Sequence, residues 1–234
     1  MVNCEKSSIV IVDILSGQII YAEFERRLQS DCVHEQVAKA DCECPLYGLF
    51  DDINVEDEKV AESCVHIYTG DGKGKTTAAV GLAVRFAGNG GKVLFTQFLK
   101  DGTSSELRIL KQIPEITVYS AEKNFGFTFR MDEETKRQAR AYYDHYLAEA
   151  LRRATEDAYG LLVLDEICAA YRAEMINRKR LLAFLEQRPQ NLEVVLTGRD
   201  PAEELLAYAD YVSEVRKIKH PFERGITARE GIEY

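Results

Sequence analysis

The residues best suited to chemistry form a glycine-rich stretch at positions 69–77, with the sequence TGDGKGKTT. An apolar run precedes this stretch and a helical pattern follows it, which is the strand–loop–helix setting of a phosphate-binding loop. Glycines let a backbone approach phosphate oxygens, and the amides that open the helix then face the anion. We therefore expect a nucleotide phosphate to bind at Gly70, Asp71, Gly72, Lys73, Gly74, Lys75, Thr76 and Thr77.

Two side chains of this loop have specific expected roles. Lys75 would reach a phosphate, and the Thr76 hydroxyl would bind Mg²⁺ or Mn²⁺. Thr69 stands where the common pattern has its first glycine, so the loop begins one residue later, at Gly70. Because the loop is shorter than usual, we expect it to hold a triphosphate differently.

A second motif carries two carboxylates at the end of an apolar run, in the sequence LLVLDE at positions 161–166. In proteins with a phosphate loop, an acidic residue at such a strand end binds Mg²⁺ directly or through water. We therefore predict a metal site formed by Thr76 and Glu166, with Asp165 ligating through water or from the second shell. In a hydrolase, Glu166 would instead activate water. Without the phosphate loop, the same motif would be an ordinary solvated strand end.

Arg199 follows another expected strand, Glu193–Thr197, at the end of the sheet where ligands bind. A guanidinium matches phosphate oxygens well, so a contact with the triphosphate is one interpretation. A structural salt bridge is the other, since arginines at protein surfaces commonly pair with carboxylates.

The elements that must position these residues alternate between strand and helix patterns from Val65 onward. Strands are expected at Val65–Thr69, Lys92–Leu99, Ile116–Ser120, Leu161–Asp165, Glu193–Thr197 and Tyr211–Val215. Helices are expected at Lys75–Ala87, Ser105–Ile113, Met131–Asp157, Arg178–Gln187 and Pro201–Ala209. This alternation predicts an α/β fold that is P-loop NTPase-like (RecA-like), with a mostly parallel sheet and helices on both faces.

The first quarter of the chain has a different composition. Residues 1–63 contain 5 Lys/Arg and 14 Asp/Glu, so they carry the whole net charge of −9, whereas residues 64–234 contain 25 of each. We predict a small acidic appendage with its linker at 1–60 and the main domain at 61–234. The appendage reads as α+β, with a hairpin of Ser7–Ile14 and Gln18–Phe24 and a helix from Glu25 to Ala40.

Cysteines gather in the same appendage. Cys42 and Cys44 lie two positions apart, with Cys32 and His34 nearby in the sequence. A metal-binding cluster is therefore one interpretation of these residues. The spacing is not the usual one of structural zinc, and free thiols are the simpler interpretation. A role in dimerisation or partner docking is a further alternative.

Composition and hydropathy exclude several classes of partner. The acidic balance argues against a general nucleic-acid or anionic-membrane binder. No apolar run approaches the ~20 residues that span a bilayer, and the N-terminus lacks the pattern of a secretory signal. We therefore expect a cytoplasmic protein whose cysteines stay reduced.

Taken together, residues 65–234 resemble the P-loop corrinoid adenosyltransferases, the ATP:cob(I)alamin adenosyltransferases of the CobA/BtuR type. The matching stretches are GDGKGKTTAA (70–79), Gln97-Phe98, GFTF (126–129), LDE (164–166), TGR (197–199), KHPF (219–222) and GIEY (231–234). Asp71 departs from the asparagine that is usual in the family. Its extra negative charge beside a triphosphate is costly unless paired, with Lys73 as the candidate partner.

The resemblance implies a reaction. The 5′-deoxyadenosyl group of ATP moves to the Co(I) of a reduced corrinoid, and inorganic triphosphate leaves. ATP would lie with its γ-end where other P-loop proteins hold inner phosphates. Lys75, the loop amides and Mg²⁺ would stabilise the leaving group. Two other functions stay open: a non-catalytic regulator that binds ATP and corrinoid, and a general P-loop ATPase or kinase.

The resemblance also assigns roles outside the phosphate loop. Phe127 and Phe129 would help to exclude the lower axial ligand of cobalt, which makes Co(II) easier to reduce. From the residue types alone, burial in the core is the default interpretation of these aromatic side chains. The family further implies a flavoprotein reductant and a homodimer.

Overall fold

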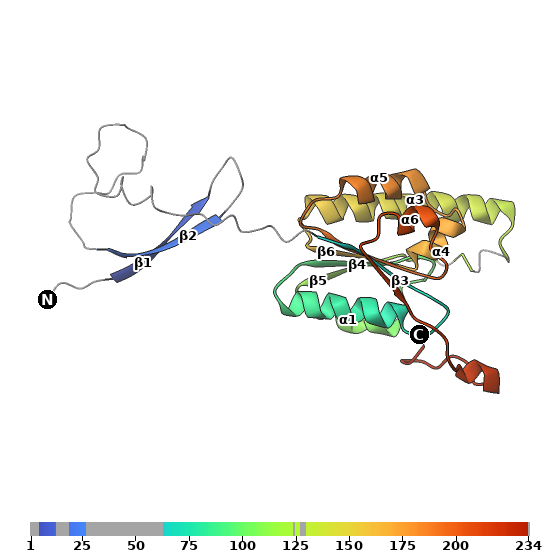
Figure 1. Ribbon diagram of the computed structural model, residues 1–234. Helices are drawn as coiled ribbons and strands as arrows, with labels where there is room; N and C mark the ends of the chain where they lie inside the picture. Colours follow the sequence, from blue (N-terminus) through green and yellow to red (C-terminus); the bar gives the residue numbers. More distant parts are fainter. Residues whose placement is uncertain (1–4, 13–18, 27–62, 124, 127–129, 234) are drawn as a thin grey trace. The chain divides into compact units, whose positions relative to one another are not determined.

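The computed structural model describes residues 5–12, 19–26, 63–123, 125–126 and 130–233 (Figure 1). The chain divides into two compact units, Met1–Glu56 and Asp57–Tyr234. Each unit is described by itself below.

In the first unit, the described residues form an antiparallel pair of strands, β1 (Glu5–Val12) and β2 (Ile19–Arg26). Two strands were predicted here, and both are shifted by one or two residues. The predicted helix from Glu25 is wrong at its start, because Glu25 and Arg26 belong to β2. In the register of the pair, Glu25 lies opposite Lys6 and Arg26 opposite Glu5. The rest of that helix and the cysteine cluster lie outside the described residues.

The second unit is built on a six-stranded sheet with the order β5-β4-β6-β7-β3-β8. Its strands are β3 (Val65–Thr69), β4 (Val93–Gln97), β5 (Ile116–Ser120), β6 (Leu161–Asp165), β7 (Glu193–Thr197) and β8 (Tyr211–Glu214). Every pairing within this sheet is parallel. The predicted α/β class is confirmed, and the sheet is parallel throughout.

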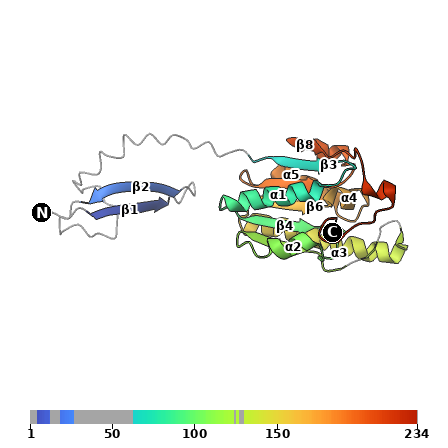
Figure 2. The same cartoon turned by 90° about the horizontal axis from the view of Figure 1, so that it is seen from below.

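Helices cover both faces of the sheet (Figures 1 and 2). The helices are α1 (Lys75–Gly88), α2 (Ser105–Leu110), α3 (Glu133–Glu156), α4 (Ile167–Arg172), α5 (Arg178–Gln187) and α6 (Glu203–Leu206). Figure 2 looks onto the face covered by α1 and α2. Since successive strand residues point to opposite faces, Leu161 and Val163 of β6 pack in the core beneath α1, whereas Leu162 and Leu164 pack in the core beneath α3.

The helix predictions need three corrections. Helix α4 was not expected, because its Ile167, Cys168, Ala170 and Tyr171 are all buried and its short sequence shows no polar face. Helix α3 begins later than predicted, since Asp132 caps it by accepting a hydrogen bond from the Thr135 amide at 2.7 Å. Two helices are shorter than predicted: α2 ends at Leu110 rather than Ile113, and α6 is a single turn, Glu203–Leu206, rather than Pro201–Ala209. Within the described part of the chain, no helix has the length and apolar character needed to cross a membrane.

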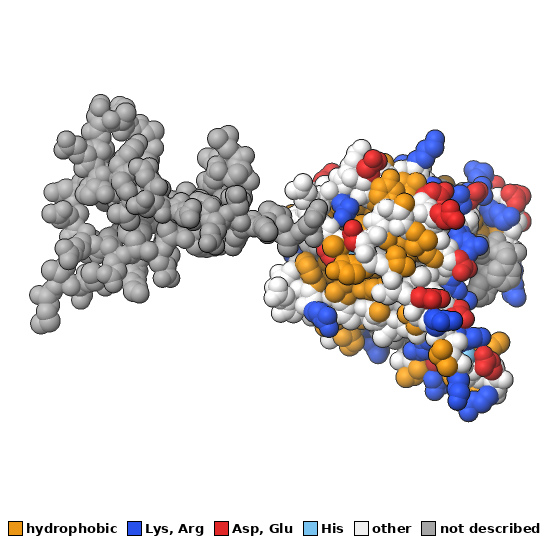
Figure 3. All heavy atoms as spheres, viewed as in Figure 1, with side chains coloured by type: hydrophobic (Ala, Val, Ile, Leu, Met, Phe, Trp, Pro, Cys, Tyr) orange, Lys and Arg blue, Asp and Glu red, His pale blue; other side chains and the backbone are white. Residues whose placement is uncertain are grey.

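The chain beyond β8 is exposed and passes through a short 3₁₀ turn, η2 (Pro221–Arg224). His220 caps this turn, because its Nδ1 accepts a hydrogen bond from the Phe222 amide at 3.2 Å. Ile218 and Phe222 are 84% and 73% exposed. Figure 3 shows Lys and Arg side chains beside hydrophobic ones in this C-terminal region, which is red in Figure 1.

Candidate nucleotide site

The predicted phosphate loop lies where the parallel strands end, beside a cavity of about 900 Å³. The cavity is lined by Lys73, Thr76, Thr77, Val80, Leu99, Lys100, Asp101, Thr103, Ser104, Ser105, Glu106, Arg108, Ile109, Gly126, Gly231, Ile232 and Glu233. The lining therefore combines cations, carboxylates, hydroxyl groups and aliphatic side chains. This is the edge of the sheet at which the topology of α/β proteins places ligands.

The side chain of Lys75 lies inside the phosphate loop. Its Nζ donates hydrogen bonds to the carbonyl oxygens of Gly70 at 2.8 Å and Gly72 at 2.9 Å. Burial lowers the pKa of Lys75, and the positive charge of Arg199 lowers it further. The loop thus holds this ammonium group in place, at a point where an anionic ligand would relieve its poor solvation.

Backbone amides of the loop supply the other half of an anion site. Helix α1 makes its first hydrogen bond from the Ala78 amide to the Gly74 carbonyl, at 2.8 Å. Among the described residues, the amides of positions 73–77 donate to no protein acceptor. Unshared amides at a helix N-terminus are a favourable environment for phosphate oxygens.

The chain after β8 docks onto this loop. The Gly72 amide donates to the Val215 carbonyl at 2.7 Å, and the Val215 amide donates to the Thr69 carbonyl at 2.8 Å. The Lys217 amide donates to Asp71 Oδ1 at 2.9 Å, which lowers the pKa of Asp71. The partner of Asp71 is therefore this backbone amide rather than Lys73. The sequence offered no signal for the contact, because the two residues lie 146 positions apart.

This docking gives two glycines of the loop a role beyond phosphate approach. A Cβ atom at Gly70 would lie 2.4 Å from the Val215 oxygen, and one at Gly72 would lie 2.7 Å from the same atom. A Cβ atom at Gly74 would make only an ordinary contact with Val215 Cγ1, at 3.8 Å, but its φ of 127° is a backbone conformation that favours glycine. Because the Gly72 amide is used by Val215, the loop offers fewer donors to a phosphate than its sequence suggests.

We expect Gly72→Ala to lower the free energy of unfolding by about 1–3 kcal/mol and to raise the KM for ATP, because the methyl group forces the loop away from Val215. Urea denaturation and steady-state kinetics measure the two effects. Gly81→Ala in α1 is the matched control, since nothing lies within 4 Å of that position. Alanine there should be neutral or stabilise the helix by up to about 1 kcal/mol. Equal changes in the free energy of unfolding and in KM for the two variants would contradict the docking of Val215 on the phosphate loop.

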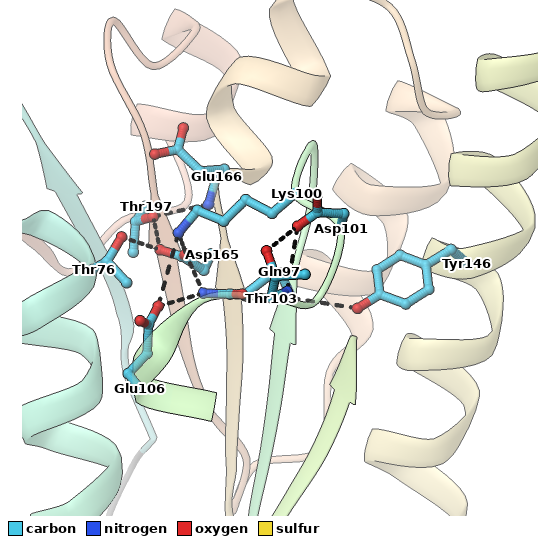
Figure 4. A network of polar contacts seen from close by, with 10 residues as sticks. All are labelled: Thr76, Gln97, Lys100, Asp101, Thr103, Glu106, Tyr146, Asp165, Glu166 and Thr197. Atoms are coloured by element: carbon cyan, nitrogen blue, oxygen red, sulfur yellow. Dashed lines mark hydrogen bonds and ion pairs between the residues drawn. The ribbon is translucent and has the colours of Figure 1, made fainter. Parts of the chain in front are cut away.

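Asp165 is the centre of the polar network drawn in Figure 4 and is fully buried. Four side chains donate to it: Thr76 Oγ1 at 2.9 Å and Thr197 Oγ1 at 2.7 Å to Oδ1, and Lys100 Nζ at 2.8 Å and Gln97 Nε2 at 3.2 Å to Oδ2. An ionised carboxylate has about four acceptor directions, so these donors saturate it. Asp165 is thus held in place and in turn orients Thr76.

Glu166 has a different environment. Its backbone is left-handed, with φ of 61°, and its amide donates to Thr197 Oγ1 at 2.9 Å. The carboxylate takes no part in the network of Figure 4. Burial raises the pKa of Glu166, and the neighbouring Asp165 raises it further. A carboxylate that is desolvated and lacks a donor is suited to a cation.

Three partners of Asp165 were given no role in the site from the sequence, although Gln97 and Thr197 lie in stretches that match the family. Gln97 ends β4, Lys100 lies three residues beyond it, and Thr197 ends β7. Gln97 Nε2 also donates to Glu106 Oε1 at 2.8 Å, which ties α2 to the network. The available signal was the position of polar residues at the ends of apolar strands.

Of the remaining predicted residues, Arg199 is exposed and directly follows Gly198. Among the described residues it forms no ion pair, so the structural salt bridge is not observed. Its charge acts on Lys75, Asp71 and Glu166, lowering the pKa of each. Phe127 and Phe129 lie outside the described residues.

Three residues without the freedom of glycine adopt left-handed backbone at this edge of the sheet. Leu99, Glu166 and Asp200 have φ values of 56°, 61° and 45° and follow β4, β6 and β7. Such conformations are disfavoured for residues with a side chain and often occur at functional sites.

Strand β3, the glycine-rich loop, helix α1 and the acidic end of β6 together define a nucleotide-binding protein of the phosphate-loop class. Residues 61–234 match the family described as ATP:corrinoid adenosyltransferase BtuR/CobO/CobP. The corrinoid adenosyltransferase of Pseudomonas aeruginosa is 33% identical over 186 residues, which cover 77% of this chain and 90% of that protein. Corrinoid adenosyltransferase CobA of Salmonella typhimurium is 30% identical over 183 residues, covering 78% and 91%.

Among solved structures, a KaiC-like protein from Pyrococcus horikoshii OT3 has a TM-score of 0.42 and 16% identity, covering 66% of this chain and 73% of that one. The family match spans nearly the whole second unit and includes every residue of the site described above. The chain belongs to the ATP:corrinoid adenosyltransferase family.

Proposed function

We propose that this chain transfers the 5′-deoxyadenosyl group of ATP to the Co(I) of a reduced corrinoid and releases inorganic triphosphate. Family membership supports the reaction. The observation that carries it in the structure is the anion site formed by the Lys75 ammonium group and the unshared amides of the phosphate loop, beside the cavity. No histidine or cysteine is among the described residues that line the cavity, so no Ser–His or Cys–His pair is available there.

In this reaction the Co(I) electron pair attacks the 5′-carbon, and the bond from that carbon to the triphosphate oxygen breaks. The electrons of the broken bond leave with the triphosphate. The protein must align the two substrates and stabilise the charge on the leaving group. We assign that stabilisation to Lys75, to the unshared loop amides and to the guanidinium of Arg199, which lies near the loop.

A divalent cation fits the oxygen donors present. Donating its proton to Asp165 leaves the Thr76 oxygen with lone pairs for a cation, and the Glu166 carboxylate has no competing donor in Figure 4. Asp165 itself is saturated, so we assign it the role of orienting Thr76. Mg²⁺ or Mn²⁺ held by Thr76 and Glu166 would neutralise triphosphate charge. In the described part of the chain, no group of three or more His, Cys, Asp or Glu side chains is arranged to hold a metal ion.

Three further expectations belong to this proposal. A flavoprotein would supply the electron that reduces Co(II), the active form would be a homodimer, and the location would be the cytoplasm. We also assign catalysis to residues 61–234 and leave 1–60 as an appendage. The family match to 61–234 and the separate compact unit at Met1–Glu56 support that division.

The test is incubation of the purified chain with ATP, Mg²⁺ and chemically reduced cobalamin. We expect a light-sensitive Co–C product in stoichiometric amount with triphosphate. Formation of ADP and phosphate would instead indicate an ATPase or kinase. Tight corrinoid binding without turnover would indicate a regulator.

For the predicted aromatic residues, we expect Phe129→Ala to reduce turnover that starts from Co(II) and to leave turnover from Co(I) nearly unchanged. The physical reason is that a more open pocket lets a lower axial ligand reach cobalt, which makes Co(II) harder to reduce. Parallel assays from the two oxidation states measure the difference. Equal losses from both would count against this role.

A further inference from the structure

Lys100 places a positive charge among the carboxylates at the end of β6. Its Nζ donates to Asp165 Oδ2 at 2.8 Å and lies 4.0 Å from Glu106 Oε1. Figure 4 shows the Lys100 side chain extending to both carboxylates. Among the described residues, no other cation forms an ion pair with Asp165. Lys100 is therefore the counter-ion of this buried acid.

The position of Lys100 is also that of a residue which meets ligands. Its side chain is 28% exposed, and it lines the cavity together with Thr76 and Glu106. Thr76 Oγ1 and Lys100 Nζ donate to opposite oxygens of the same Asp165 carboxylate. The ammonium group thus lies beside the place at which Thr76 is expected to hold a cation.

Asp165 and Glu166 are adjacent carboxylates, and divalent cations such as Mg²⁺ prefer carboxylate oxygens. Of the four side chains that donate to Asp165, three are neutral and only Lys100 is charged. The neutral donors leave the negative charge of the carboxylate in place, whereas the ammonium group cancels it. Lys100 is therefore the partner that makes Asp165 a poor ligand for a second cation.

The charge of Lys100 also reaches Glu166. Burial raises the pKa of Glu166, Asp165 raises it further, and the positive charge of Lys100 opposes both effects. Because charges interact strongly in partly buried sites, an ammonium group here also repels a divalent cation that approaches without phosphates.

We propose that Lys100 is a positioning residue for the divalent cation: it occupies Asp165 and leaves the cation to Thr76 and Glu166. This inference rests on the metal site of the proposed function. Asp165 then stays free to orient Thr76, and the cation keeps coordination positions for phosphate oxygens and water. Two protein ligands beside an ammonium group hold a divalent cation weakly, so the cation enters with ATP.

The experiment measures Mn²⁺ binding by electron paramagnetic resonance, without nucleotide or corrinoid, in the wild-type chain and in variants of Lys100. We expect Lys100→Met to bind Mn²⁺ about tenfold more tightly, because the change removes a repulsive charge and vacates Asp165 Oδ2. Lys100→Arg should match the wild type, since it keeps the charge. Lys179→Met is the matched control, because it removes a lysine charge from the exposed surface of α5 and should leave Mn²⁺ affinity unchanged.

A double variant tests whether the gain comes from Asp165 itself. In Lys100→Met combined with Asp165→Asn, the increase in Mn²⁺ affinity should disappear, since the vacated carboxylate is gone. An increase that persists there, or equal Mn²⁺ affinity of Lys100→Met and the wild type, would overturn the proposal. Weaker binding of tripolyphosphate with unchanged Mn²⁺ affinity would show instead that Lys100 contacts the triphosphate. If Lys100→Met does not fold, the neutral Lys100→Gln takes its place in each comparison.

These titrations contain no corrinoid, so their outcome is separate from that of the adenosyl transfer. If the wild-type chain forms no Co–C product, the proposed reaction fails, whereas the Mn²⁺ data still decide the role of Lys100. Failure of the wild-type chain to bind Mn²⁺ even with tripolyphosphate would overturn the metal site and this inference together.

Discussion

Lys75→Ala is expected to lower kcat by about 10²–10³-fold, the loss that follows removal of a donor to a developing negative charge. The ammonium group already lies between the Gly70 and Gly72 carbonyls, so the enzyme spends no energy on moving it into place. Since negative charge grows on the triphosphate as the bond breaks, the interaction is stronger in the transition state than with bound ATP. The effect should therefore appear in kcat more than in KM.

Steady-state kinetics with saturating reduced corrinoid measure this effect. Lys179→Ala is the matched control, because Lys179 is an exposed lysine of α5 away from the loop. The thermal unfolding midpoint of Lys75→Ala should stay within about 5 °C of the wild type, given that only hydrogen bonds to two loop carbonyls are lost. A loss confined to KM would show that Lys75 binds the substrate without stabilising the leaving group.

Asp165→Ala should have the second large effect, a fall of about 3–5 kcal/mol in the free energy of unfolding together with loss of turnover. Asp165 is fully buried and accepts from two threonine hydroxyls, an amide and the ammonium group of Lys100. Without the carboxylate, Lys100 keeps a partly buried charge whose closest acid is Glu106, at 4.0 Å. Thr76 also loses the partner that orients its hydroxyl.

Urea denaturation gives the stability of this variant, and the assay from Co(I) gives its activity. Asp200→Asn is the control for stability, because it removes an ion pair with Arg172 whose side chains are 54% and 80% exposed. Exposed pairs of this kind contribute about 0–1 kcal/mol. Similar changes for the two variants would contradict the assignment of Asp165 as the centre of the network.

Much of the fold was predictable, because its strands are short apolar runs with clear ends. The strands β3, β5, β6 and β7 and the helix α5 have the predicted bounds. Helix α4 was missed since burial on all sides removes the periodic contrast on which helix prediction depends. The predicted start of α3 at Met131 was two residues early, because Asp132 caps the helix and Glu133 is its first residue.

The candidate site was predictable where it is contiguous in sequence. The phosphate loop and the pair Asp165–Glu166 are local motifs, and their roles stay predictions until they are tested. The site gains three further residues only because β4 and β7 flank β6: Gln97, Lys100 and Thr197. The sequence of a single strand does not reveal which strands lie beside it. The contact of Val215 with the loop depends in the same way on β8 lying beside β3.

The left-handed residues at the ends of β4, β6 and β7 have a consequence for engineering. Leu99, Glu166 and Asp200 each hold a backbone conformation that costs of order 1 kcal/mol or more, so relaxing them offers a direct gain in heat resistance. Selection for heat resistance alone would therefore favour substitutions at the edge of the sheet that carries the proposed site, where Glu166 is the proposed metal ligand. We expect thermostable variants obtained in this way to be slower enzymes, and a library screened for both properties to leave these three positions unchanged.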